Sequence, residues 1–185
     1  NKFPDNPRTF FNLGLTYEKL NKYSDSLIFY EKCLKIDSTD ILAMNNLGNV
    51  YSSLRKTDLA EKNYKKALNL DKKNSLILFN YITFLIRMGR NEEAEKLIRK
   101  GIKINRNFVL FYTALAQTKK FKEKDPDITF MQKVKREIQS DDNSKSELLF
   151  ALSKAYEDTE NYKDSALSLS EANNLKFSSL NYNNE

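Results

Sequence analysis

Three asparagines, Asn12, Asn46 and Asn80, recur 34 residues apart in the first half of the chain. Each carboxamide offers a hydrogen-bond donor and an acceptor, so a column of them can bond to the backbone of an extended peptide. The alternative is that these amides merely tie helix ends together within the fold. The chemistry that this spacing offers is therefore recognition through hydrogen bonds, either of a ligand or of the chain itself.

Other residue types argue against catalysis. The 185-residue sequence contains no histidine, which removes the commonest general base, the usual Ser and Cys triads, and most catalytic zinc sites. The single cysteine, Cys33, falls at a helix position that Ala67 and Gly101 occupy elsewhere in the chain, which indicates a buried thiol. Four scattered glycines provide no phosphate-binding loop. We expect a chain without enzymatic activity, metal or cofactor.

The 34-residue period extends beyond the asparagines. Matching residues are Leu13, Gly14 and Tyr17 with Leu47, Gly48 and Tyr51, and then Ser26, Tyr30 and Cys33 with Ala60, Tyr64 and Ala67. Apolar residues within each unit follow helical spacing, and only 4 glycines and 3 prolines are available for turns. Short breaks are expected at Asn21-Lys22, Arg55-Lys56 and Gly89-Arg90. Each unit is therefore predicted to be a pair of helices that pack closely at the small residues.

This pattern resembles the tetratricopeptide repeat, a helix-turn-helix unit of 34 residues. The resemblance implies an all-α, right-handed superhelix, a solenoid of about five repeats whose first helices line a concave groove. The expected limits are 7–40, 41–74 and 75–108 for three regular repeats, 109–145 for a divergent fourth with an insertion, and 146–179 for the fifth. Residues 1–6 look like the remnant of a preceding repeat, and 180–185 like a tail. Because the chain begins with Asn, we expect further sequence upstream.

The fourth repeat departs from the strict period. A lysine-rich stretch leads to Asp125-Pro126-Asp127, where Asp can cap a helix and Pro suits its first turn. This predicts a displaced helix that runs to about Gln139, followed by a break at residues 140–144.

Three segments carry a more particular resemblance. Residues Asp125–Ile128, Phe150–Asp158 and Glu171–Lys176 resemble the last repeat region of bacterial proteins that join tetratricopeptide repeats to a C-terminal sulfotransferase-like domain. Ser153 departs from the glycine that is usual in that region. The resemblance implies that a catalytic domain would lie beyond Glu185, outside this sequence.

The tetratricopeptide resemblance also places candidate peptide-binding residues in the concave groove. Besides Asn12, Asn46 and Asn80, the candidates on neighbouring positions are Phe11, Asn45, Asn49, Phe79, Thr83 and Gln117. Some family members clamp a C-terminal carboxylate with Lys and Arg at particular groove positions. Those positions hold Phe11, Leu15, Leu76 and Asn80 here, so we do not expect this ligand.

Charge and composition restrict the partners further. Residues 1–136 carry 27 basic and 15 acidic side chains, whereas residues 137–185 carry 4 and 10. The excess is mostly lysine, typical of solvated helix faces, and the scarcity of arginine disfavours nucleic-acid binding. No apolar run approaches the roughly 18 residues of a membrane span. We therefore expect a cytoplasmic protein, a monomer or weak dimer, that binds protein or peptide; a structural scaffold for self-association is the alternative.

Overall fold

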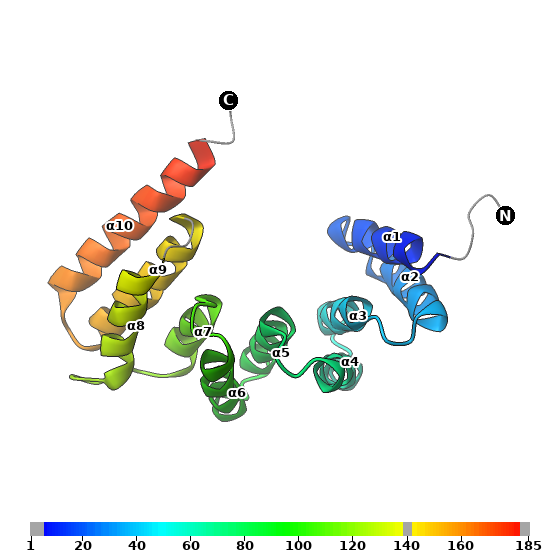
Figure 1. Cartoon of the computed structure of the whole chain (residues 1–185), viewed down its shortest axis with the longest axis horizontal. Helices are drawn as coiled ribbons and strands as arrows, with labels where there is room; N and C mark the ends of the chain where they lie inside the picture. Colours follow the sequence, from blue (N-terminus) through cyan, green and yellow to red (C-terminus); the bar gives the residue numbers. More distant parts are fainter. Residues whose placement is uncertain (1–5, 139–141, 182–185) are drawn as a thin grey trace. The chain divides into compact units, whose positions relative to one another are not determined.

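The computed structural model describes residues 6–138 and 142–181. Most of the expected remnant at 1–6 and of the expected tail at 180–185 therefore lies outside the described residues. The described part consists of ten helices without a strand (Figure 1). They are α1 (Pro7–Lys19), α2 (Tyr23–Ile36), α3 (Ile41–Ser53), α4 (Thr57–Leu70), α5 (Ser75–Arg87), α6 (Asn91–Ile104), α7 (Leu110–Thr118), α8 (Pro126–Glu137), α9 (Asp142–Asp158) and α10 (Tyr162–Asn181). The prediction of an all-α fold is confirmed, and the repeat limits stay a prediction.

Residues in the left-handed conformation end four of the helices at tight turns. They are Asn21, Arg55, Gly89 and Glu160, with φ of 57°, 58°, 72° and 59°. After Asn21, the N–H of Lys22 donates to the carbonyl of Tyr17 at 2.9 Å, which satisfies one of the orphan carbonyls of α1. The breaks expected at the first three of these positions are confirmed.

The chain divides into two compact units, Asn1–Phe84 and Leu85–Glu185. In the first unit, α1 packs on α2 and α3 packs on α4, as Figure 1 shows in blue and cyan. Gly14 lies against the ring of Tyr30, and a Cβ at Gly14 would come within 2.6 Å of that ring. Gly48 meets the ring of Tyr64 in the same way, at 2.7 Å. The prediction that small residues mark close helix contacts is confirmed.

In the second unit, α7 is short, and residues 119–125 carry the chain to α8. Asp125 accepts a hydrogen bond from the N–H of Asp127 and so caps α8, which has Pro126 in its first turn. The displaced helix is confirmed, and it ends at Glu137. After it, α9 already begins at Asp142, inside the stretch where a break was expected, and the acidic side chain there suits the start of a helix. None of the helices in the described part of the chain is long and apolar enough to cross a membrane.

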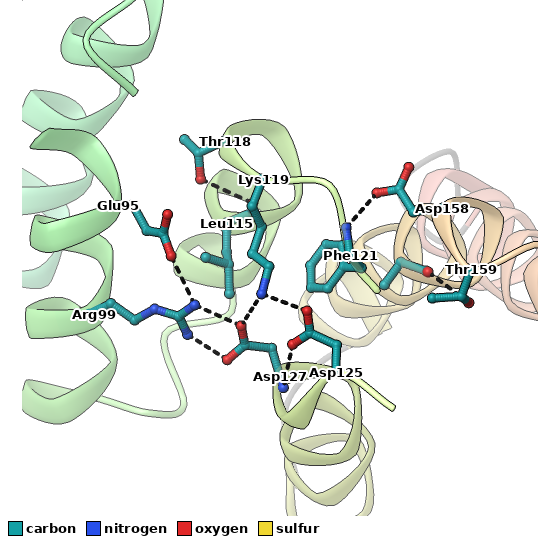
Figure 2. Close-up of polar contacts among 11 residues, drawn as sticks. Glu95, Arg99, Leu115, Thr118, Lys119, Phe121, Asp125, Asp127, Asp158 and Thr159 are labelled. Atoms are coloured by element: carbon teal, nitrogen blue, oxygen red, sulfur yellow. Dashed lines mark hydrogen bonds and ion pairs between the residues drawn. The ribbon is translucent and has the colours of Figure 1, made fainter. Parts of the chain in front are cut away.

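A cluster of charged side chains connects α8 to α6 and to the end of α7 (Figure 2). We call Arg99, Lys119, Asp125 and Asp127 the Asp127 cluster. Asp127 accepts hydrogen bonds from Arg99 Nη2 at 2.7 Å and from Lys119 Nζ at 2.8 Å. Lys119 also pairs with Asp125 at 2.7 Å. Burial by itself raises the pKa of Asp127, but the bonds from Arg99 and Lys119 outweigh it and hold that pKa below its usual range.

Replacing Asp127 by Asn should therefore destabilise the protein by about 1–3 kcal/mol at neutral pH, because two buried cations lose a charged partner. A carboxyl with a depressed folded-state pKa contributes stability above its unfolded pKa of about 3.9, and this stability is lost as the pH falls. The variant should thus lose less stability than the parent between about pH 7 and pH 3. Urea unfolding at several pH values measures this, with the exposed Glu157→Gln as a control; parallel pH profiles for parent and Asp127→Asn would contradict the account.

Candidate functional site

A continuous chain of hydrogen bonds crosses the first unit. Asn80 Nδ2 on α5 donates to Asn45 Oδ1 on α3 at 3.0 Å, and Asn45 Nδ2 donates to Asn46 Oδ1 at 3.1 Å. Asn46 Nδ2 then donates to the Tyr30 hydroxyl on α2 at 3.0 Å. The Tyr30 hydroxyl donates to Glu18 Oε2 on α1 at 2.7 Å. We call Glu18, Tyr30, Asn46, Asn45 and Asn80 the amide row.

The row contains two of the three asparagines of the predicted column. Asn46 and Asn80 are half-buried members, whereas Asn12 is exposed and lies outside the row. Asn45 is only 3% exposed, so it supports its neighbours and offers little surface to a ligand. The amides therefore do bond to other parts of the fold, as the alternative interpretation held, but the partly exposed ones keep bonding capacity to spare.

The other candidate residues of the first unit surround the row. The ring of Phe11 packs against that of Tyr30, with centroids 5.8 Å apart. Asn49 lies one helical turn after Asn45, and its Oδ1 accepts from the Tyr64 hydroxyl at 2.7 Å. Phe79 and Thr83 are half-buried on α5, directly before Asn80 and one turn after it. Polar amides and apolar rings thus lie within one or two turns of each other.

Gln117 belongs to the second unit. It is exposed there and helps to line a pocket of about 470 Å³ formed by α7, α9 and α10. Phe150 also lines this pocket, and the ammonium of Lys176 lies 5.5 Å from the centre of its ring. Lys176 also pairs with Glu147 at 3.7 Å.

Glu18 and Tyr30 were not among the predicted site residues, although the sequence holds a signal for them. Tyr30 and Tyr64 share a register, but their hydroxyls need different partners because the surrounding residues differ. In the first unit of the period, Glu18 provides the acceptor; 34 residues later that position is Ser52, and Asn49 accepts instead. Comparing acceptors around each tyrosine would have found the pair.

Electrostatics fix the protonation of this end of the row. Burial raises the pKa of Glu18, and the hydrogen bond from Tyr30 opposes that shift. Burial and the contact with Glu18 both raise the pKa of Tyr30 far above its ordinary value. At neutral pH the pair therefore consists of a carboxylate that accepts and a neutral hydroxyl that donates.

Comparisons with known proteins bear on the fold. Models described as tetratricopeptide repeat match residues 7–40, 29–62 and 53–118. The search of curated proteins finds no match.

Solved structures of similar fold include Pseudomonas aeruginosa pilF, with 20% identity and a TM-score of 0.70, covering 91% of this chain and 75% of that one. YrrB, described as a TPR protein with an unusual peptide-binding site, matches at 20% identity and TM-score 0.59, over 92% of this chain and 87% of that one. The Arabidopsis OM64 TPR domain matches at 17% identity and TM-score 0.55, over 71% and 96%. At such identities the similarity shows the fold alone, and it confirms the predicted helical-repeat fold.

Replacing Tyr30 by Phe should lower the free energy of unfolding by about 1–3 kcal/mol, because a partly buried carboxylate and an amide both lose their partner while the ring stays in place. Tyr17→Phe is the matched control: Tyr17 stacks on Phe29 at 5.2 Å, and its hydroxyl takes no part in the row. Urea unfolding measures both variants. Equal stability of Tyr30→Phe and the parent would show that the row contributes nothing to the fold.

Proposed function

Because the chain belongs to the tetratricopeptide repeat family, we propose that it is a non-catalytic scaffold that binds an extended protein segment across α1, α3 and α5. The observation that supports the proposal best is the amide row. Asn46 and Asn80 each hold one amide hydrogen bond within the row and remain half-buried, so they are held in place and still accessible. A ligand that binds to fixed groups costs less ordering entropy than one that must first immobilise them.

The proposed contacts divide between main chain and side chains. Asn46, Asn49 and Asn80 would hold the backbone of the segment, because their amides recur along the unit rather than meeting at one point. Phe11 and Phe79 would contact its apolar side chains, and Thr83 would add a hydroxyl next to Asn80. Asn45 would act from beneath by orienting Asn46 and Asn80. Binding through the backbone gives broad tolerance of sequence.

Asn12 and Gln117 have a different place in the proposal. Asn12 is exposed on α1 without a bond to hold its amide, so it would contribute less than the two row members. Gln117 would act in the second unit, where the pocket beside Phe150 has the size to accept a single side chain of a partner. That contact is independent of the row.

The narrower predictions remain predictions. A sulfotransferase-like domain downstream, a bacterial source and a cytoplasmic location rest on the sequence resemblance and on composition. The coding sequence that flanks this fragment tests the first of these, since a sulfotransferase would need a phosphate-binding loop for its sulfonucleotide.

A peptide ligand can be obtained by selecting from a random library displayed on phage, with the chain immobilised. Fluorescence anisotropy then gives the dissociation constant of the labelled peptide. We expect the double variant Asn46→Ala, Asn80→Ala to bind at least roughly 5-fold more weakly, because two net hydrogen bonds are each worth about 0.5–1.5 kcal/mol. Asn69→Ala, at an exposed position on α4 away from the row, is the matched control and should bind like the parent.

Circular dichroism must first show that the double variant is folded at the temperature of the titration. Unchanged affinity in a folded double variant would refute the proposal. Sedimentation velocity of the same samples addresses the alternative of a self-association scaffold. A monomer at the titration concentration agrees with a free groove, whereas a dimer that dissociates when peptide is added would place the self-contact in the groove instead.

A further inference from the structure

One charge determines the direction of every hydrogen bond in the amide row. A carboxylate can only accept, so the hydroxyl of Tyr30 must donate to Glu18 and is left with lone pairs for Asn46. Asn46 must then present Nδ2 to Tyr30, which turns its Oδ1 toward Asn45. By the same logic Asn45 presents Nδ2 to Asn46, and Asn80 presents Nδ2 to Asn45. The observed donors and acceptors follow this order throughout.

The fixed direction decides which groups are left for a ligand. The amide oxygens of Asn46 and Asn49 already accept, from Asn45 and from Tyr64. Each amide nitrogen carries two hydrogens, and Asn46 and Asn80 use one of them in the row. The half-buried amides of Asn46, Asn49 and Asn80 therefore offer mainly N–H donors, although Asn80 also keeps its Oδ1.

We propose that this face recognises the backbone carbonyl oxygens of an extended, uncharged segment, and that Glu18 is the positioning residue that sets the preference. The inference rests on the proposed function, since it describes how the same groove reads its ligand. An uncharged segment fits better than an acidic one, because the donors are neutral amides and the carboxylate of Glu18 terminates the row. Phe11 and Phe79, which flank the amides, favour apolar side chains between the carbonyls.

The surroundings of Glu18 leave its charge without a basic partner. Within the residues that the structure describes, Glu18 takes part in no ion pair. Of the helices packed against α1, α2 brings Tyr30 to the carboxylate, and α3 brings the uncharged Asn46 to that same hydroxyl. Once Glu18 is neutral, Tyr30 can accept from it, and the row loses the group that fixes its direction.

The orientation of the row can be tested without a ligand. In the parent, the side-chain amide resonances of Asn45, Asn46 and Asn80 in a ¹H–¹⁵N spectrum should shift together as the pH falls through the titration of Glu18. In Glu18→Gln this shared titration should vanish. Glu31→Gln is the matched control, because Glu31 also accepts from a tyrosine hydroxyl, that of Tyr51 at 3.1 Å, outside the row; it should leave the shared titration intact. Amide resonances that do not respond to pH in the parent would overturn the role of Glu18.

The preference for carbonyls can be tested with thioamides in the library-selected peptide. A thioamide accepts hydrogen bonds more weakly than an amide and donates them more strongly, so its two effects have opposite signs. We expect a thioamide at a groove-contacting position to weaken binding to the parent roughly 2- to 10-fold, the range of one hydrogen bond. Glu18→Gln should bind the unmodified peptide more weakly and respond less to the thioamide. Tighter binding of the thioamide peptides would show that the groove reads N–H groups and would overturn the inference.

The two proposals fail in different ways. If the double variant Asn46→Ala, Asn80→Ala binds the peptide like the parent, the proposed function fails, whatever the thioamides do. If that variant loses binding while thioamides strengthen binding to the parent, the groove is confirmed and its reading direction is wrong.

Discussion

The hydroxyl of Tyr30 is the point on which the first unit depends. Its ring lies against Gly14, where no other residue would leave room for it, and this close contact carries the hydroxyl between α1 and α3. There it donates to Glu18 and accepts from Asn46. One side chain of α2 therefore connects two helices, determines how an amide of α3 is turned, and so passes the charge of Glu18 on to the amides that a ligand would meet.

The second unit meets a different constraint. Its α8 is displaced from the regular period, and the Asp127 cluster joins it to α6 and α7 (Figure 2). The N–H of Phe121 also donates to the carboxylate of Asp158 at 3.2 Å, which holds the connecting segment to α9. Charged side chains here replace the contacts between small and aromatic residues that define the regular pairs. An irregular repeat can therefore keep a fixed structure, because buried charges are well ordered when each has a partner.

The sequence predicts most of the fold because its signals are local and repeated. The 34-residue period, the turns at Asn21 and Arg55, and the small residues Gly14 and Gly48 all recur in register. The candidate site was less accessible, since its key contacts join residues that do not repeat: Glu18 has Ser52 as its counterpart, and Asn49 has Leu15. The burial of Asn45 and the separation of Asn12 from the row depend on side-chain packing between helices, which a single sequence does not specify.

The central claim is that the amide row holds a ligand by its carbonyl oxygens. A crystal structure of the chain with a library-selected peptide tests it most directly. The account predicts peptide carbonyl oxygens within about 3 Å of Nδ2 of Asn46 and Asn80, with the bonds from Asn80 to Glu18 unchanged. A peptide that lies elsewhere, or one that donates its N–H groups to the oxygens of these two asparagines, would contradict the account.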